Sequence, residues 1–116
     1  MKIITVCGTR PELIRLSIIL SKLDRLVDSK MVFTNQNYDY SLSGQFFEEL
    51  KIRKPDYTFD STSGSFSGFL ANALVEFEDI LALEKPDKIL ILGDTNSGLL
   101  SILADRHKIP VYHMEA

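Results

Sequence analysis

The chain has 116 residues, a formal net charge of −3, 45% hydrophobic residues and 25% charged residues. This composition is ordinary for a globular domain, and the charge gives no reason to expect a nucleic acid or a membrane surface as a partner. No apolar stretch approaches the ~20 residues of a membrane span, and no signal-peptide pattern opens the chain. The single cysteine, Cys7, excludes an internal disulfide and fits the cytoplasm. Its place in an apolar run predicts a buried side chain rather than a nucleophile.

Four short apolar runs predict β-strands. Ile, Leu and Val dominate residues 2–7 and 88–92, as expected for strands that are covered on both faces. Residues 30–33 and 111–113 are shorter runs of the same kind. Because helical patterns separate these runs, their order predicts an α/β fold with a mostly parallel, Rossmann-like or flavodoxin-like sheet and helices on both faces.

Three helices are predicted between the strands. Leucines at three- and four-residue spacing over residues 13–23 predict the first helix, which Asp28-Ser29 closes. A longer pattern predicts a second helix from Phe66 to Leu81, and a third pattern begins at Leu99. Residues 61–68 are small and polar, and they predict a loop before the second helix. We find no repeat and no interdomain linker.

A pentapeptide, GTRPE, directly follows the first predicted strand. Thr9 and Glu12 form a capping box, and Pro11 is tolerated in the first helical turn. Neither role explains Arg10, because a cation in the first turn opposes the helix dipole. Arg10 therefore predicts an anionic partner such as a phosphate. Arg15 lies one turn further along, where it either assists Arg10 or is a solvated surface residue.

Polar residues also follow the later strands. Asp94 comes after an apolar strand, and since residues 95–97 offer other helix caps, we favour a functional carboxylate. Glu115 lies just beyond the last strand, where a half-buried carboxyl group with a raised pKa serves as an acid or a base. His113 lies on the same face of an extended chain as Glu115. A satisfied core histidine, or one that supports other site residues, is the favoured interpretation of His113.

The segment 34–40 after the second strand is rich in amides and hydroxyls. Gln36 and Asn37 in this segment either bind a sugar or nucleotide or belong to a capped loop. The two histidines, His107 and His113, are not spaced like metal ligands, so we expect no metal site.

Four motifs in register, GTRPE, Gln36–Asp39, Gly93–Thr95 and His113–Ala116, resemble the non-hydrolysing UDP-N-acetylglucosamine 2-epimerase family. The resemblance runs through the whole chain. It implies two Rossmann-like domains that face a cleft, as in glycosyltransferase-B enzymes. Residues 1–116 correspond to a truncated N-terminal domain, and the C-terminal domain is absent.

The resemblance also implies a mechanism. UDP is eliminated to leave a glycal and is added back on the other face, which inverts C2 of a UDP-2-acetamido sugar. Asp94 and Glu115 match the family's acid/base carboxylates, Arg10 matches a cation near the diphosphate, and no metal or other cofactor is required. The other candidate substrate-binding residues are Arg15, Gln36, Asn37 and His113.

Within the family, Asn37–Tyr40, residues 52–57 and Gly93–Ser97 resemble the branch that epimerises UDP-2-acetamido-2,6-dideoxy-hexoses toward UDP-N-acetyl-L-fucosamine, for capsule or O-antigen. UDP-N-acetylglucosamine enzymes usually carry His at the position of Asn37. The chain departs from the family at Asn35, where Gly is usual, and at Arg15, where the glucosamine enzymes favour Lys. The alternative is a UDP-N-acetylglucosamine 2-epimerase that forms UDP-N-acetylmannosamine.

An alternative of another class is a non-catalytic flavodoxin-like or receiver-like binding module. A receiver carries clustered acids at the tip of its first strand, and a flavodoxin carries a Ser/Thr-rich phosphate loop there, whereas this chain has GTRPE. As a half-cleft without the domain that supplies most UDP contacts in the family, the isolated chain is expected to be inactive. Its expected partners are a UDP-sugar, the missing C-terminal domain and a second copy in a homodimer.

Overall fold

The computed structural model describes residues 1–7, 10–34, 55–59, 65–92 and 100–114. Along these ranges, strands and helices alternate as the sequence predicts, except that residues 28–33 and 57–58 are two successive strands. No helix in them is long and apolar enough to cross a bilayer. The elements are β1 (Lys2–Cys7), α1 (Arg10–Leu26), β2 (Asp28–Phe33), β3 (Tyr57–Thr58), α3 (Phe66–Glu84), β4 (Lys88–Leu92), α4 (Ser101–Arg106) and β5 (Val111–Met114).

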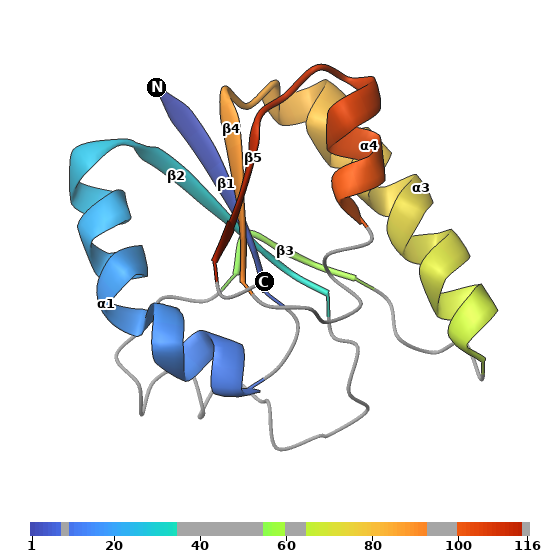
Figure 1. The fold of residues 1–116 in the computed structure, drawn as a ribbon, viewed down its shortest axis with the longest axis horizontal. Helices are drawn as coiled ribbons and strands as arrows, with labels where there is room; N and C mark the ends of the chain where they lie inside the picture. Colours follow the sequence, from blue (N-terminus) through green and yellow to red (C-terminus); the bar gives the residue numbers. More distant parts are fainter. Residues whose placement is uncertain (8–9, 35–54, 60–64, 93–99, 115–116) are drawn as a thin grey trace.

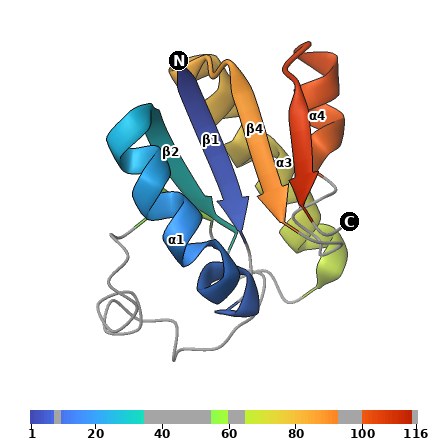
Figure 2. The same cartoon turned by 60° about the vertical axis from the view of Figure 1, so that its left-hand side comes forward.

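All five strands form one parallel sheet in the order β3-β2-β1-β4-β5 (Figure 1). β1 lies at the centre, where its two neighbours pair with it along most of its length. Figure 2 shows the strands pointing toward one common edge. We call this the carboxyl edge, and we call the opposite one the amino edge. The predicted parallel α/β sheet is thereby confirmed.

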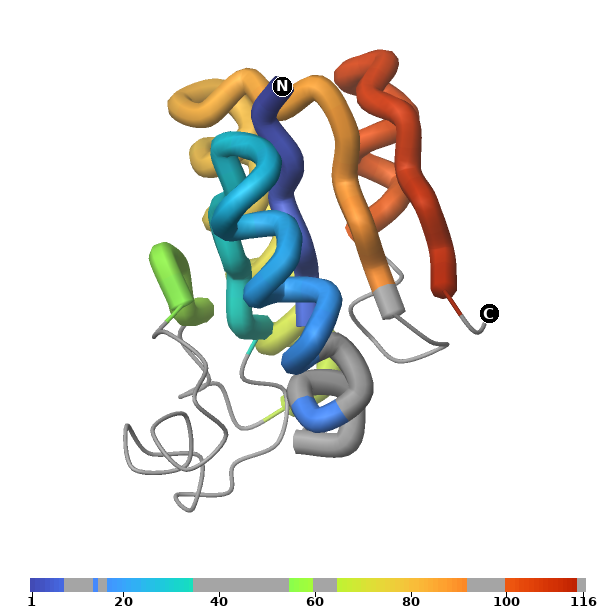
Figure 3. Tube along the Cα trace, turned by 90° about the vertical axis from the view of Figure 1, so that its left-hand side faces the viewer, coloured from blue at the N-terminus to red at the C-terminus, as the bar shows by residue number. Residues whose placement is uncertain are grey.

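Helices cover both faces, as expected. Figure 3 shows α1 in front of the sheet, with α3 and α4 behind it. On the α3 side, Ile4 and Val6 of β1 pack into one core cluster with Phe77 of α3, all of them fully buried. Side chains alternate along a strand, so Thr5 and Cys7 face α1, and they too are fully buried. Both faces of β1 are therefore covered, which explains its almost uninterrupted apolar run.

The predicted end of the first helix was wrong. α1 ends at Leu26, and Asp28-Ser29 opens β2 instead of closing the helix. The backbone N–H of Asp28 donates to the carbonyl of Met1 at 3.1 Å, and Asp28 pairs in register with Lys2. A polar dipeptide that is typical of a helix end is thus part of the sheet, because its backbone finds ladder partners there.

Two further boundaries differ from the prediction. α3 begins at Phe66, as its apolar pattern predicts, whereas the predicted loop ran on to residue 68; Ser65 caps the helix by accepting a hydrogen bond from the Gly68 N–H at 3.1 Å. Gly68 therefore lies in the first turn of the helix and not in a loop; residues 61–64 lie outside the described residues. β5 extends one residue further than expected, to Met114.

Candidate functional site at the carboxyl edge

The chain segments that carry the predicted site residues all leave the sheet at its carboxyl edge. Cys7 at the end of β1 pairs with Phe33 at the end of β2, and Leu92 of β4 pairs with Met114 of β5, so these strands end level with their neighbours. The strand order reverses between β1 and β4. Ligands of open α/β sheets bind outside the carboxyl ends of the strands at such a switch point.

The helix that follows β1 supplies a positive dipole end at this edge. α1 begins at Arg10, three residues after β1 ends at Cys7. Figure 2 shows the first turn of α1 next to the arrowhead of β1. Backbone N–H groups at a helix N-terminus bind anions, since they lack partners within the helix. The arrangement thus suits a phosphate or diphosphate at the end of β1.

Most of the predicted site residues cannot be placed by their side chains. Arg10 and Arg15 lie in α1, but their side chains are outside the described part of the structure. Asp94 comes two residues after β4, and Glu115 directly follows β5, so both belong to segments that leave the carboxyl edge. The residues that lie wholly outside the described ranges are Gln36, Asn37, Asp94 and Glu115.

His113 is the candidate whose side chain the structure describes. It is the third residue of β5 and is exposed, so the interpretation as a core histidine was wrong, while a role in supporting other site residues stays a prediction. Its side chain lines an open hollow of about 400 Å³ between α4 and β5, together with Ser101 and Asp105. Because the side chains of the other candidates lie outside the described part of the structure, the contacts of His113 with them and with substrate stay predictions.

Buried side chains pack against one another where β1 and β2 end at the carboxyl edge. Thr34 is 1% exposed, and its backbone N–H donates to the carbonyl of Cys7 at 2.9 Å. The Cys7 side chain is fully buried, with its Sγ 3.8 Å from the carbonyl of Val32. The prediction that the Cys7 side chain is buried is confirmed. Thr34, which the sequence analysis grouped with the polar segment 34–40, is buried at the end of β2.

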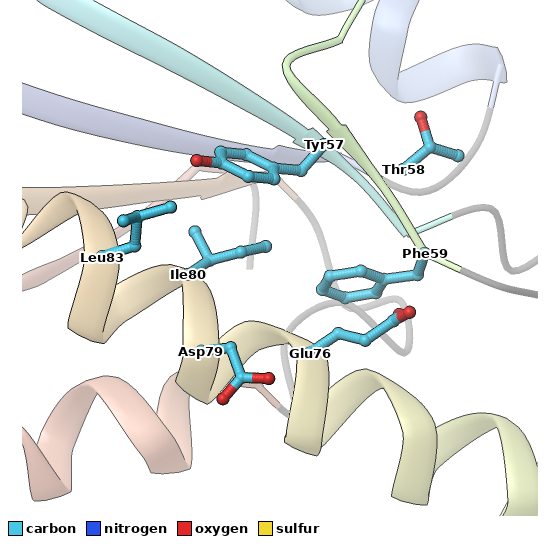
Figure 4. Close-up of a pocket in the computed structure, with 7 residues that line it drawn as sticks. All are labelled: Tyr57, Thr58, Phe59, Glu76, Asp79, Ile80 and Leu83. Carbon is cyan, nitrogen blue, oxygen red and sulfur yellow. The ribbon is translucent and has the colours of Figure 1, made fainter.

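A pocket of about 260 Å³ lies elsewhere, between β3 and α3 (Figure 4). Figure 4 shows the rings of Tyr57 and Phe59 facing α3, while Thr58 points to the other side of its strand. The lining carries the carboxylates Glu76 and Asp79 and no Lys or Arg. Such a lining repels a diphosphate, so this pocket is not the predicted nucleotide site.

A group of charged and polar side chains at the amino edge was not predicted from the sequence. Glu84 accepts hydrogen bonds from the Tyr57 hydroxyl at 2.5 Å and from the Lys2 Nζ at 3.0 Å. Its hydrogen bond to Glu84 raises the pKa of Tyr57 to about 12. Hydrogen bonds from Tyr57 and Lys2 lower the pKa of Glu84, and the pKa of Lys2 rises. The cluster joins β1, β3 and the end of α3.

Within the described residues, no group of His, Cys, Asp and Glu has the arrangement of a metal site.

Comparison with known proteins gives these observations a family context. Residues 21–116 match the family model described as UDP-N-acetylglucosamine 2-epimerase. The whole chain is 38% identical to a UDP-2,3-diacetamido-2,3-dideoxy-D-glucuronate 2-epimerase of Pseudomonas aeruginosa, covering 34% of that protein. It is 39% identical to a UDP-N-acetylglucosamine 2-epimerase of Methanocaldococcus jannaschii, covering 32% of it.

Solved structures agree with this result. The crystal structure of the M. jannaschii enzyme in complex with UDP-GlcNAc and UDP superposes with a TM-score of 0.89 at 39% identity. The match takes in 100% of this chain and 33% of that one. The chain thus spans about a third of the length of the relatives that it matches.

Proposed function

Because the chain belongs to the UDP-N-acetylglucosamine 2-epimerase family, we propose that it forms the first part of the N-terminal domain of a UDP-sugar 2-epimerase. The observation that carries this proposal is the match of the whole chain, at a TM-score of 0.89, to an enzyme crystallised with UDP-GlcNAc and UDP. In this proposal, the carboxyl edge is one wall of the substrate cleft. The C-terminal domain of the complete enzyme forms the opposite wall.

The reaction proceeds by elimination and re-addition. A base removes the proton from C2 of the sugar, the bond between C1 and the diphosphate oxygen breaks, and a glycal and UDP result. A proton then returns to C2 from the opposite face while UDP adds back to C1. Asp94 and Glu115 do the acid/base work, and their places, two residues after β4 and directly after β5, support this assignment.

Cationic and amide groups hold the departing UDP. Arg10 and the N-terminus of α1 stabilise the negative charge that develops on the diphosphate, since preorganised donors at such a place lower the barrier. Arg15 supports Arg10 from the next helical turn. The other substrate contacts come from Gln36, Asn37 and His113.

The substrate in this proposal is a UDP-2-acetamido-2,6-dideoxy-hexose, used for surface polysaccharide. Asn37–Tyr40 supports this choice, and the P. aeruginosa relative shows that 2-epimerases of this similarity are named for sugars other than N-acetylglucosamine. UDP-N-acetylglucosamine is the second candidate, because the M. jannaschii enzyme carries that name at 39% identity. The isolated chain has no turnover of its own, and the complete enzyme is a cytoplasmic homodimer.

A chimera tests the proposal. Residues 1–116 replace the segment of the M. jannaschii enzyme that aligns with them, and both candidate UDP-sugars are offered in deuterated water. We expect C2 epimers with deuterium at C2 from the chimera and none from the isolated chain. A folded chimera without deuterium incorporation contradicts the function. A thermal shift of the isolated chain by FMN or Mg²⁺, but not by UDP, supports the flavodoxin-like or receiver-like alternative.

A further inference from the structure

The tripeptide KPD occurs twice in the chain, at residues 54–56 and 85–87, and each copy directly precedes a strand. β3 begins at Tyr57, and β4 begins at Lys88. The two strands lie in different parts of the sheet, because β3 pairs with β2 and β4 pairs with β1. The two copies therefore allow an internal comparison of what the tripeptide does at the start of a strand.

The aspartate of each copy makes the same pair of hydrogen bonds. The Asp87 carboxylate accepts the backbone N–H of Lys2 in β1 at 2.8 Å, and the Asp87 N–H donates to the Lys2 carbonyl at 2.8 Å. The Asp56 carboxylate accepts the N–H of Met31 in β2 at 2.8 Å, and the Asp56 N–H donates to the Met31 carbonyl at 2.9 Å. Each aspartate thus holds both main-chain groups of one residue in the neighbouring strand. We call this arrangement the Asp clamp.

Each Asp clamp lies one residue before the first pair of its ladder. That pair is Ile3 with Lys88 for β4, and Val32 with Tyr57 for β3. The carboxylate does here what a main-chain carbonyl does inside a ladder. The proline before each aspartate has a fixed φ and no N–H, so the chain enters the strand with few alternative conformations. The clamp therefore holds the start of each strand at one position along its neighbour.

β4 needs such a contact because its side chains do not specify its register. A one-residue slip moves every side chain of a strand to the opposite face, which in a sheet with one buried face exposes apolar side chains. Residues 88–92 read KILIL, so isoleucine alternates with leucine. Ile89 and Ile91 are fully buried in the core cluster on the α3 side, whereas Leu90 lies on the α1 side. Apolar side chains therefore lie on both faces of β4.

The apolar pattern opposes a slip of β4 by one residue toward the amino edge only weakly. Leu90 and Leu92 then take the places of the two isoleucines beside β1, and Lys88 moves outward. Leucine and isoleucine have nearly the same volume, and exchanges between them are tolerated in cores. The observed register therefore depends on contacts other than apolar packing, and the Asp clamp is the first of them along this ladder.

We propose that Asp87 is a positioning residue: its clamp on Lys2 fixes the register of β4 on β1, and thereby the point at which the chain leaves the carboxyl edge toward Asp94. Asp56 fixes β3 on β2 in the same way. A one-residue slip moves the end of β4 by about 3.3 Å, whereas a misplacement of about 1 Å already costs a reaction on the order of 10²-fold. The clamp stands on its own contacts, and only its consequence for Asp94 rests on the proposed function.

NMR of the isolated chain tests the clamp directly. In the native register, Ile91 lies opposite Val6, and cross-strand nuclear Overhauser effects report this pairing. In Asp87→Ala, we expect a second set of signals that places Leu92 opposite Val6, in at least about half of the molecules. The reason is that the loss of a charge-assisted hydrogen bond shifts such an equilibrium by about tenfold or more.

Two matched variants separate register from general stability. Asp87→Asn keeps an oxygen that accepts the Lys2 N–H, so it should show the native set of signals alone. Asp56→Ala removes the Asp clamp of the other tripeptide and should leave the register of β4 native. A single native set in folded Asp87→Ala, or a slipped β4 in Asp56→Ala, would overturn the proposal.

The chimera described above gives a second measurement, which also covers a failure of the isolated Asp87→Ala chain to fold. In Asp87→Ala, kcat per molecule that binds UDP should fall at least about twofold, in proportion to the slipped fraction. KM should stay unchanged, since Asp94 follows β4 whereas Arg10 follows β1. Asp87→Asn should restore kcat. An unchanged kcat in Asp87→Ala, or a raised KM in its place, would overturn the positioning role. A slipped register in the isolated chain, together with an inactive parent chimera, would retain the clamp and reject the function.

Discussion

At the amino edge of the sheet, Glu84 joins Lys2 and Tyr57 through side-chain hydrogen bonds, whereas at the carboxyl edge the strands lead into the segments that carry Asp94 and Glu115. The amino-edge cluster connects β1, β3 and the end of α3, which are far apart in the sequence. The carboxyl edge offers a helix N-terminus and level strand ends for a ligand. This difference indicates that one edge of the same sheet stabilises the fold, and that the other is available for chemistry.

The largest expected effect comes from making the same substitution, Asp to Asn, at each of the two edges. Asp94→Asn in the chimera should lower kcat by about 10²- to 10⁴-fold, because the base at the carboxyl edge is lost. Asp87→Asn is the matched control at the amino edge, where the Asp87 carboxylate accepts a hydrogen bond from the Lys2 backbone N–H at 2.8 Å. We expect Asp87→Asn to leave kcat unchanged. Similar losses of kcat in both variants would contradict the proposal that only the carboxyl edge takes part in the chemistry.

A second prediction concerns stability alone. Glu84→Ala removes the acceptor of both the Tyr57 hydroxyl and the Lys2 ammonium. The free energy of unfolding should fall by about 1–2 kcal/mol, because two hydrogen bonds are lost from a partly solvated site. Urea denaturation of the isolated chain measures the change. Glu78→Ala, at an exposed position of the same helix, is the control and should have a much smaller effect. In the chimera, Glu84→Ala should leave kcat unchanged.

The architecture followed from the sequence, but the amino-edge cluster did not. Apolar runs at residues 2–7 and 88–92 predicted the central strands, because burial on both faces requires such runs. β3 escaped prediction because Tyr57-Thr58 has no apolar run and is a strand only through its pairing with Val32 and Phe33. The cluster at Glu84 escaped as well, since its partners lie 27 and 82 residues away in the chain and nothing local signals their contact.

The site was predicted in outline only. The strand pattern placed Arg10, Asp94 and Glu115 after strands of a parallel sheet, and the observed register brings those strand ends to one edge. Which way a side chain points in a loop depends on tertiary contacts that spacing does not encode. His113 shows the limit of such reasoning: a core position was one of its two favoured interpretations, but β5 lies at the edge of the sheet and His113 is exposed.

The pH dependence of stability tests the amino edge further. The pKa of Tyr57 is raised from 10.0 to about 12 in the folded chain, so its contribution to stability is complete below pH 10 and is lost as the pH rises toward 12. Tyr57→Phe should lack this loss, so the difference in the free energy of unfolding between the parent chain and Tyr57→Phe should shrink between pH 10 and about 12.

The lowered pKa of Glu84 acts in the opposite direction. Its contribution is present above the ordinary value of 4.5 and is lost as the pH falls below it, a loss that Glu84→Gln should lack. Chemical denaturation at each pH measures both, and a pH-independent difference between Tyr57→Phe and the parent chain would contradict the assignment.

The smallest expected effect lies between the two edges, at the centre of β1. Thr5 is fully buried, and its hydroxyl has no hydrogen-bond partner in the described structure. Burial of an unpaired hydroxyl costs free energy, so Thr5→Val, which keeps the β-branched shape, should leave stability unchanged or raise it by up to about 1 kcal/mol. Because Thr5 touches neither the amino-edge cluster nor the carboxyl edge, kcat of the chimera and the Tyr57-dependent loss of stability at high pH should both persist. A decrease in the free energy of unfolding of more than about 1 kcal/mol would mean that the Thr5 hydroxyl forms a hydrogen bond with a buried group. Polar contacts that stabilise the fold would then lie at the centre of the sheet as well as at its amino edge.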